Sequence, residues 1–207
     1  MPSSFRNAIL VIGCLVASAC SSPSGGSPSD GLPFVEADSV RSGDLVCRLG
    51  NGYFSGIFRR FSGDSKRFSH IGVFHRKGDS CFVIHADADE MNGVGSVRME
   101  SLSEFLRQSL DHQFYRFVSD SIRCGVDSIA LDYFRQGIPF DNRFDLSSDS
   151  SLYCTELVAV AINISSHDDS IVPPFSLSES FRYYRIDDIL NCGLLEPIPG
   201  EGKPSRQ

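Results

Sequence analysis

Residues 68–87 have the sequence FSHIGVFHRKGDSCFVIHAD, and this stretch decides the fold. Two runs rich in Phe, Ile and Val flank a Lys-Gly-Asp-Ser segment, a pattern that predicts a β-hairpin with a Gly-Asp turn. A two-residue and a four-residue loop give the same register, with Gly72 opposite His85 and His70 opposite Asp87. The hairpin therefore predicts which side chains share each face of the sheet.

Side chains alternate between the two faces of a strand, so the register sorts them into two groups. We expect one face to be hydrophobic core and the other to gather the polar groups. The core face carries Ile71, Val73, Phe82, Ile84 and Ala86, and the polar face carries His70, Gly72, His85 and Asp87. His70 and His85 become diagonal neighbours roughly 7 Å apart. Gly72 between them leaves room for a substrate or another backbone.

A cysteine stands where a polar loop gives way to an apolar helix, in LYCTELV at residues 152–158. Several serines in 147–151 are candidate N-caps for this helix. Cys154 shares a helix face with Leu157, Val158 and Ala161, so its thiol should point inward. The positive helix end and a nearby imidazolium are expected to lower the thiol pKa, and thiolate is the nucleophile of thiol-based hydrolysis. Cys154 is therefore a candidate nucleophile.

The remaining pattern predicts an α+β domain of antiparallel strands with segregated helices. A Ser101–Glu104 capping box opens a short helix. The other expected elements are a turn followed by a strand at 43–49, strands at 94–99 and 114–118, an irregular or weakly helical connection at 51–65, a helix at 122–136 and closing strands at 182–186 and 194–198.

The chain has 207 residues, enough for one domain with a proper core. Its formal charge of −7, with no stripe of Lys and Arg, argues against nucleic acid as a partner. We expect a single domain over 34–199 and a disordered tail over 200–207. No cofactor is expected.

The N-terminal segment predicts export. Arg6 precedes an apolar run over 8–19, which is too short to span a bilayer. The run ends in Ala-Ser-Ala before Cys20, which resembles a bacterial lipoprotein box. We therefore interpret 1–20 as a signal peptide ending at a lipidated Cys20, and the Ser/Gly/Pro-rich stretch 21–33 as a flexible tether. The protein would be anchored to a membrane, facing the periplasm or the cell exterior; ordinary secretion with cleavage before Cys20 is the alternative.

Five cysteines follow Cys20, so at least one thiol is unpaired within the chain. Cys47 and Cys81 are both expected on strands and are a candidate disulfide. Several other polar residues have structural interpretations: Asp44 as a turn residue that holds backbone N–H groups, Glu156 as a residue that offsets the helix dipole, Asp141 and Asp145 in turns, and His75, His112 and His167 on the surface or in packing.

Three short motifs resemble those of a known family. Gly-Asp-Leu-Val at 43–46, Ser-His-Ile-Gly-Val at 69–73 and Val-Ile-His-Ala at 83–86 are similar to strand motifs of NlpC-like papain-fold cysteine hydrolases. The cysteine helix follows these strands here, an order that resembles the circularly permuted branch typified by YiiX and YebB. The resemblance implies an antiparallel sheet or partial barrel packed on the helix that carries the nucleophile. It implies Cys154 as nucleophile, His70 as its base and His85 as the residue that orients His70.

The residues leave one assignment open, because Asp87 lies opposite His70 and is an alternative orienting residue. The resemblance implies hydrolysis of an amide, with cell-wall peptide as the leading substrate and a lipid acyl ester or amide as the competitor. Two further interpretations stay open: a metal site of His70 and His85 with Cys154 or Asp87, and a binding scaffold without activity.

Overall fold

The computed structural model describes residues 39–199, apart from 90, 108 and 148–149. The predicted signal peptide, tether and C-terminal tail thus lie outside the described residues, and the described residues all belong to one compact unit. No helix in the described ranges combines the length and apolar character needed to cross a membrane.

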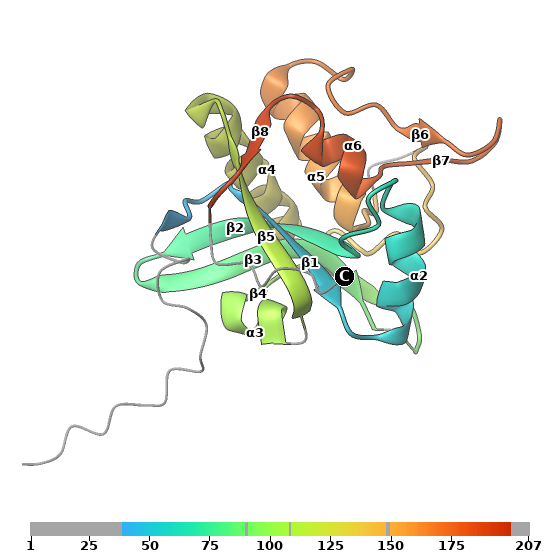
Figure 1. Ribbon diagram of the computed structural model, residues 1–207, viewed down its shortest axis with the longest axis horizontal. Coiled ribbons are helices and arrows are strands. Elements are labelled where there is room, and N and C mark those ends of the chain that lie inside the picture. The colour runs from blue at the N-terminus through green and yellow to red at the C-terminus, as the bar shows by residue number, and fades with distance from the viewer. Residues whose placement is uncertain (1–38, 90, 108, 148–149, 200–207) are drawn as a thin grey trace, which may run out of the picture. The chain divides into compact units, whose positions relative to one another are not determined.

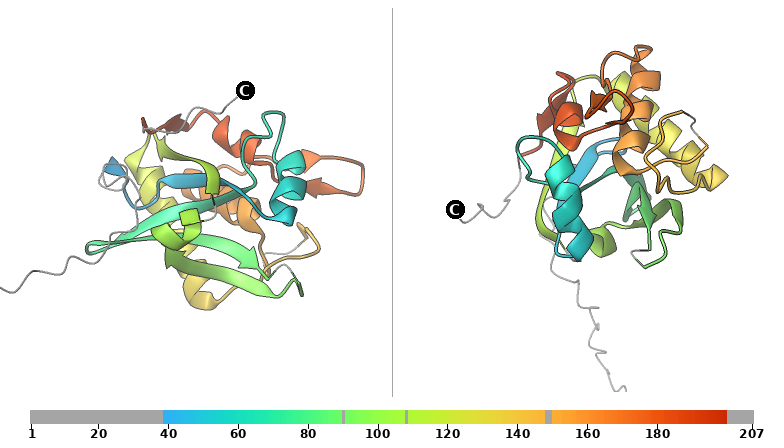
Figure 2. Two further views of the ribbon diagram at one scale, coloured as in Figure 1. Left: turned by 60° about the horizontal axis from the view of Figure 1, so that its bottom comes forward. Right: turned by 90° about the vertical axis from the view of Figure 1, so that its right-hand side faces the viewer.

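A six-stranded antiparallel sheet, in the order β4-β3-β2-β1-β5-β8, forms the centre of the α+β fold (Figure 1). Helices cover it on both sides, and a two-stranded ribbon of β6 and β7 lies beside α2 (Figures 1 and 2). The elements are β1 Leu45–Gly50, α2 Tyr53–Phe61, β2 His70–Lys77, β3 Ser80–Ala88, β4 Gly95–Ser101, α3 Leu102–Arg107, β5 Ser109–Phe117, α4 Asp120–Gln136, α5 Cys154–Ser166, β6 Phe175–Ser176, β7 Arg182–Tyr183, α6 Ile186–Leu190 and β8 Leu195–Pro197. Within the stretch 51–65, expected to be irregular or weakly helical, residues 53–61 form a helix.

The β2–β3 hairpin has the predicted register. Lys77 pairs with Ser80 and Val73 with Ile84, and continuing this register places Gly72 beside His85. Gly78 adopts a φ of 59°, the left-handed conformation that the tight turn requires. The prediction held because the turn chemistry and the alternation of apolar residues both act locally and agree.

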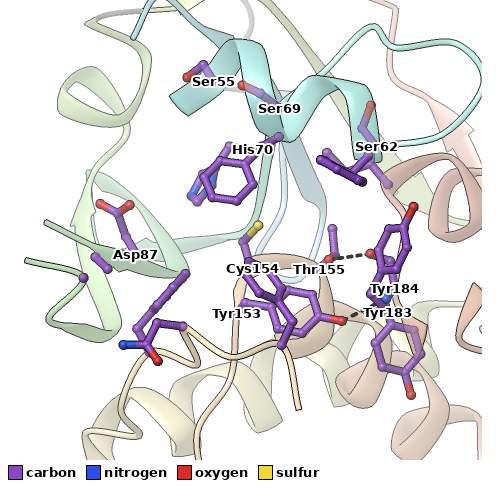
Figure 3. A pocket seen from close by; sticks show the side chains of 18 of the residues that line it. Ser55, Ser62, Ser69, His70, Asp87, Tyr153, Cys154, Thr155, Tyr183 and Tyr184 are labelled. Atoms are coloured by element: carbon purple, nitrogen blue, oxygen red, sulfur yellow. Dashed lines mark hydrogen bonds between the residues drawn. The ribbon is translucent and has the colours of Figure 1, made fainter. Parts of the chain in front are cut away.

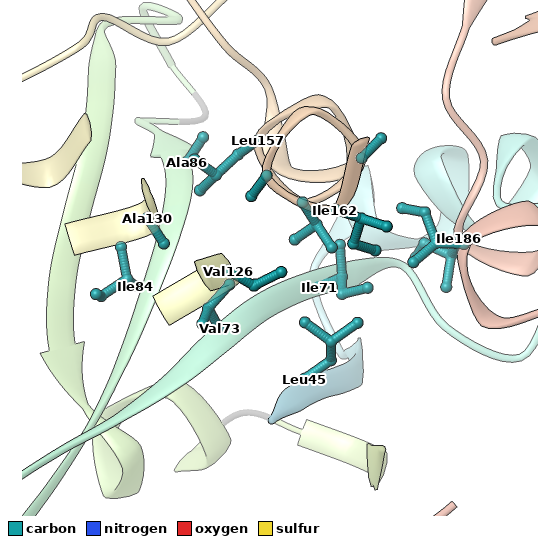
Figure 4. Packing of buried hydrophobic residues seen from close by; sticks show 14 of the residues in the cluster. Leu45, Ile71, Val73, Ile84, Ala86, Val126, Ala130, Leu157, Ile162 and Ile186 are labelled. Atoms are coloured by element: carbon teal, nitrogen blue, oxygen red, sulfur yellow. The ribbon is translucent and has the colours of Figure 1, made fainter. Parts of the chain in front are cut away.

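The core face of the hairpin packs under two helices. Figure 4 shows Leu157 and Ile162 of α5 and Val126 and Ala130 of α4 against the sheet, where they contact the buried side chains of Ile71, Val73, Ile84 and Ala86. Burial of each such aliphatic side chain stabilises the fold by about 1.5–3 kcal/mol.

The opposite face is polar only at one end, which corrects the expectation of a wholly polar face. Near the hairpin turn, Phe74 and Val83 are buried beneath α3, where they form a second cluster with Phe105 and Phe114. The polar groups are confined to the stretch from His70 to Gly72 and its partners on β3. The site therefore lies at this polar end of the sheet, where α3 does not cover the strands with aliphatic side chains.

Helix α5 begins at Cys154, but the serines of 147–151 do not cap it. Its N-cap residue is Tyr153, whose backbone N–H donates to the Glu156 carboxylate at 3.3 Å. Glu156 is almost fully buried, so it closes the first turn as well as facing the positive end of the helix dipole. The predicted inward face of the helix, including Leu157, Val158 and Ala161, is buried in the core.

Asp44 fixes the start of β1, as the sequence predicts. Its buried carboxylate accepts hydrogen bonds from the Arg41 backbone N–H at 2.8 Å and from Arg116 Nη2 at 2.6 Å. The Ser101–Glu104 cap of α3 is also present, with the Ser101 hydroxyl accepting from the Glu104 N–H at 3.2 Å.

The disulfide between Cys47 and Cys81 does not form. Cys47 lies on β1 and Cys81 on β3, and β2 separates the two strands. The cysteines of the described residues, Cys47, Cys81, Cys124, Cys154 and Cys192, are all free thiols.

Candidate functional site

A cavity of about 310 Å³ opens where the start of β2 meets the first turn of α5. Both Cys154 and His70 line it, and Asp87 lies on its wall (Figure 3). His85 stands behind His70 and is fully buried. The fold thus brings together the predicted site residues, although 84 positions of the chain separate His70 from Cys154.

Cys154 is the first residue of α5, and Figure 3 shows its sulfur directed toward His70. Burial raises the pKa of the Cys154 thiol to about 11, although the backbone N–H groups of Ile71 and Thr155 act in the opposite direction. The expectation of a lowered thiol pKa is therefore wrong for the empty cavity. Desolvation of the anion outweighs the helix end.

Two imidazoles and a carboxylate form a relay behind the cysteine. Nε2 of His70 lies 2.8 Å from Nδ1 of His85, and Nε2 of His85 lies 3.0 Å from Oε1 of Glu100. The second contact is within ion-pair distance but does not meet hydrogen-bond geometry. His85 is the direct neighbour of His70, in agreement with the orienting position that the family resemblance implies.

The relay determines where the ring protons sit. A carboxylate only accepts, so the His85 nitrogen that faces it, Nε2, is the one that carries a proton, which leaves Nδ1 of a singly protonated His85 as an acceptor. His70 then donates from Nε2, and its Nδ1 is left unprotonated. Burial, followed by the charges of His85, Arg48 and Arg98, lowers the pKa of His70 well below 6.5. His70 is therefore a neutral imidazole with a free basic nitrogen at neutral pH.

Asp87 has a different partner. Its Oδ2 lies 3.3 Å from Nη1 of Arg98, which also contacts Glu100 at 2.7 Å through Nη2. Burial raises the pKa of Glu100, but the hydrogen bond and charge of His85 and then of Arg98 outweigh it and lower the value to about 2. The carboxylate behind His85 is thus ionised throughout the neutral range.

Sequence reasoning missed Glu100 and Arg98. Both lie on β4, which pairs with β3 so that Arg98 stands opposite His85. Side-chain alternation then puts Glu100 on the same face as Arg98 and beside the imidazole. The sequence does predict a strand at 94–99. The loop before that strand, however, has no sequence feature that fixes how β4 pairs with β3.

Aromatic residues close the other side of the cavity. The Tyr153 hydroxyl accepts a hydrogen bond from the Tyr184 N–H at 2.8 Å, and the Thr155 hydroxyl donates to the Tyr184 carbonyl oxygen at 2.8 Å. These bonds tie the first turn of α5 to the segment that follows β7. Phe58 and Phe61 of α2 also line the cavity and are partly exposed.

The other histidines and aspartates that were expected to be structural lie outside this cavity lining. His75 pairs with Asp127 at 2.8 Å, and His167 ends α5 in a left-handed conformation. The Asp141 carboxylate accepts from the backbone N–H groups of Arg143 and Asp145, as a turn residue does.

The site also offers donors for a metal ion. One nitrogen each of His70 and His85 and one oxygen of Asp87 lie within 4.8 Å of one another. Two nitrogens on a tetrahedral zinc are roughly 3.4 Å apart, whereas those of His70 and His85 are 2.8 Å apart. The donor set therefore fits a metal if the two rings separate slightly. A carboxylate behind a histidine, as Glu100 is here, orients metal-bound imidazole in many proteins.

Comparison with known proteins identifies several similar chains among the solved structures, and YiiX is one of them. The crystal structure of the metalloprotein YiiX from Escherichia coli O157:H7 superposes with a TM-score of 0.62 and 15% sequence identity, over 78% of this chain and 97% of YiiX. No family model and no curated protein sequence matches the chain. An identity this low establishes the architecture alone, and the chain therefore has a YiiX-type α+β fold.

Proposed function

We propose that this chain is a cysteine hydrolase of the cell envelope, with the permuted papain-like arrangement. It would cleave an amide bond, with cell-wall peptide as the leading substrate, through an acyl-enzyme on Cys154. The observation that carries the proposal is that Cys154 and His70 line one cavity, with His85 and then Glu100 in series behind His70. A thiol, a base and two orienting groups in series are what nucleophilic acyl transfer requires.

The reaction begins from a neutral pair, because burial favours the thiol and the uncharged imidazole. Nδ1 of His70 takes the thiol proton as the Cys154 sulfur attacks the carbonyl carbon. The backbone N–H of Cys154, at the start of α5, stabilises the oxyanion. His70 passes the proton to the leaving amine, and water hydrolyses the acyl-thiol to release the acid and restore the cysteine.

The proposed lipid anchor bears on where the protein acts, and the aromatic cavity lining bears on which substrate it cleaves. Export and lipidation at Cys20 would hold the domain at the membrane, within reach of cell-wall peptide. The aromatic side chains of Phe58, Phe61 and Tyr183 beside the cavity favour the competing substrate, a lipid acyl ester or amide.

The test is hydrolysis of cell-wall peptides and of acylated lipids by the wild type and by Cys154→Ala, with Cys124→Ala as the matched control. Cys124 is exposed on α4 and does not line the cavity. We expect Cys154→Ala to lose at least 1,000-fold in kcat/KM and Cys124→Ala to match the wild type. Equal rates for Cys154→Ala and the wild type would exclude the hydrolase.

A second candidate is a metal-binding function, favoured by the donor set of His70, His85 and Asp87 and by the likeness to a metalloprotein. The His70 and His85 rings must separate before both can bind one ion, so we rank this function second. Metal analysis of the purified chain, with Asp87→Asn as the comparison, decides it. A stoichiometric ion that Asp87→Asn loses favours the metal function, and activity that survives a chelator favours the hydrolase.

A further inference from the structure

We propose that Arg48, assisted by the hydroxyl of Ser55, forms a subsite that binds an anionic group of the substrate, a carboxylate or a phosphate. The inference rests on the proposed function, because it places this subsite beside the reacting thiol. It adds a chemical requirement that the Cys-His relay itself does not impose.

Arg48 occupies the same face of the sheet as the candidate base. It lies on β1 directly opposite His70 of β2, and directly opposed residues project to one side. Arg48 lines the cavity together with His70 and Cys154. A guanidinium at this position is within reach of a group close to the scissile carbonyl.

Most of the hydrogen-bonding capacity of this guanidinium is unused. Nη1 donates to the Phe105 carbonyl oxygen at 2.6 Å, and the guanidinium carbon lies 4.5 Å from the centre of the Phe105 ring. Nε is buried without a hydrogen-bond partner among the described residues. An arginine has five N–H donors, and buried donors without partners are rare in native proteins. The contact with the Phe105 ring and the one hydrogen bond hold Arg48 in place, but they leave its positive charge available to bind another group.

Nearby acidic residues are already engaged elsewhere. Asp87 faces the same cavity but pairs with Arg98, and Glu100 contacts both Arg98 and His85. The charge of Arg48 is therefore not neutralised by a direct ion pair with either carboxylate. An incoming carboxylate or phosphate would supply the acceptor oxygens that match the guanidinium fork.

A serine hydroxyl lies near the same end of the cavity. A side-chain carbon built on Gly50 would meet the Ser55 hydroxyl at 2.4 Å and the Ser69 hydroxyl at 3.9 Å, so the two hydroxyls are neighbours. Ser69 is committed, because its hydroxyl accepts from the Gly50 N–H at 3.1 Å. Ser55 lines the cavity and is the available donor.

The cavity is therefore polar at one end and aromatic at the other. Figure 3 shows Ser55 and Ser69 above His70, and Tyr183 and Tyr184 on the far side of Cys154 in that view. The arrangement selects a substrate with an anionic group on one side of the scissile carbonyl and a less polar portion on the other.

Alkylation of Cys154 tests the subsite without requiring turnover. Iodoacetate and iodoacetamide transfer similar groups to a thiol, but only iodoacetate carries a carboxylate. We expect Arg48→Gln to lower the ratio of the iodoacetate rate to the iodoacetamide rate at Cys154 by about tenfold, measured on the full chain by peptide mapping. Ser55→Ala should lower the ratio by about threefold.

Arg60→Gln is the matched control, because Arg60 is exposed on α2 and its loss changes the net charge equally. Its ratio should equal that of the wild type. An unchanged ratio in both Arg48→Gln and Ser55→Ala would overturn the proposal, and so would an equal fall in Arg60→Gln. If Arg48→Gln does not fold, Ser55→Ala and Arg48→Lys, which keeps the charge but loses the fork, carry the test.

Protection experiments distinguish the two sources of the anion. Inorganic phosphate or acetate, compared with chloride at equal ionic strength, should slow iodoacetate labelling in the wild type and not in Arg48→Gln. Stronger protection by phosphate favours a lipid headgroup, and stronger protection by acetate favours a peptide carboxylate. Failure of this test leaves hydrolysis by Cys154 unaffected, whereas failure of the hydrolysis test leaves the alkylation ratios interpretable.

Discussion

At the scale of the residue, Cys154 carries a thiol that stays protonated at neutral pH and is therefore unreactive at rest. Its thiol lies in a desolvated cavity wall, and the pKa is raised to about 11 even though backbone N–H groups point at the sulfur. In the proposed mechanism, Cys154 therefore becomes charged only when His70 removes its proton. Such a site limits oxidation of the thiol, because the thiolate is the form that reacts.

The alkylation rate of Cys154 should report this raised pKa directly. We expect the iodoacetamide rate to rise about tenfold per pH unit beyond pH 9 and to level off near pH 11, because only the thiolate attacks. Peptide mapping across the pH series gives the rate, with the exposed Cys124 as the internal reference. A plateau below pH 8 would show that Cys154 is an ionised thiolate at rest, contrary to this expectation.

Glu100 should act on catalysis through His85. Glu100→Gln removes the charge that holds the Nε2 proton of His85, so His70 loses its fixed tautomer. We expect kcat to fall on the order of 100-fold or more with little change in KM. Glu104→Gln, on the exposed face of α3, is the control and should keep full activity. A KM effect of the same size would indicate a substrate contact instead.

The same carboxylate should contribute to acid stability. Its pKa is lowered to about 2 in the folded protein, below the value of an unfolded glutamate, so its contribution is present above about pH 4.5 and is lost as the pH falls toward 2. The full contribution is about 3 kcal/mol. Unfolding of the wild type and of Glu100→Gln, followed from pH 6 to pH 2.5, should converge at the acid end. Parallel curves would contradict the linkage.

At the scale of the element, the β2–β3 hairpin sets the spacing of the two imidazoles. A side-chain carbon at Gly72 would lie 2.5 Å from Val83 Cγ1 and 3.1 Å from His85 Cβ. We expect Gly72→Ala to destabilise the protein by about 1–3 kcal/mol and to reduce activity, because the strands must move apart beneath His85. Denaturant unfolding and hydrolysis rates measure both effects.

Gly56→Ala provides the matched control for that substitution. Gly56 is exposed on α2 and a side chain there meets nothing within 4 Å, so alanine should leave stability unchanged or raise it by up to about 1 kcal/mol. A Gly72→Ala variant as stable as the wild type would mean that the hairpin adapts without disturbing the relay.

At the scale of the whole molecule, the site exists only because α5 packs back on the hairpin core. Leu157 and Ile162 of α5 belong to the same buried cluster as Ile71 and Ala86, and Figure 4 shows Leu157 beside Ala86 and Ile162 beside Ile71, so this packing holds α5 against the hairpin. The ion pair between the buried Asp44, which directly precedes β1, and the half-buried Arg116 of β5 ties the start of β1 to β5 in the same sheet. The placement of Cys154 beside His70 thus depends on the complete core, not on a local motif.

Lipidation at Cys20 would place this whole assembly at a membrane. We expect Cys20→Ser in the full chain to move the protein from the membrane fraction to the soluble fraction of the cell envelope, because the acyl chains supply the anchoring free energy. Cys14→Ser is the control and should stay with the membrane. Membrane association that survives Cys20→Ser would show that the anchor lies elsewhere in the chain.

The sequence by itself determined the hairpin register, the inward face of α5 and the positions of Cys154, His70 and His85, because turn chemistry and apolar periodicity are local. Tertiary structure alone decided the other features. Burial reversed the expected shift of the Cys154 pKa, and the β3–β4 pairing brought Glu100 behind His85. Desolvation and strand register depend on which segments cover one another, and no local pattern in the chain specifies either.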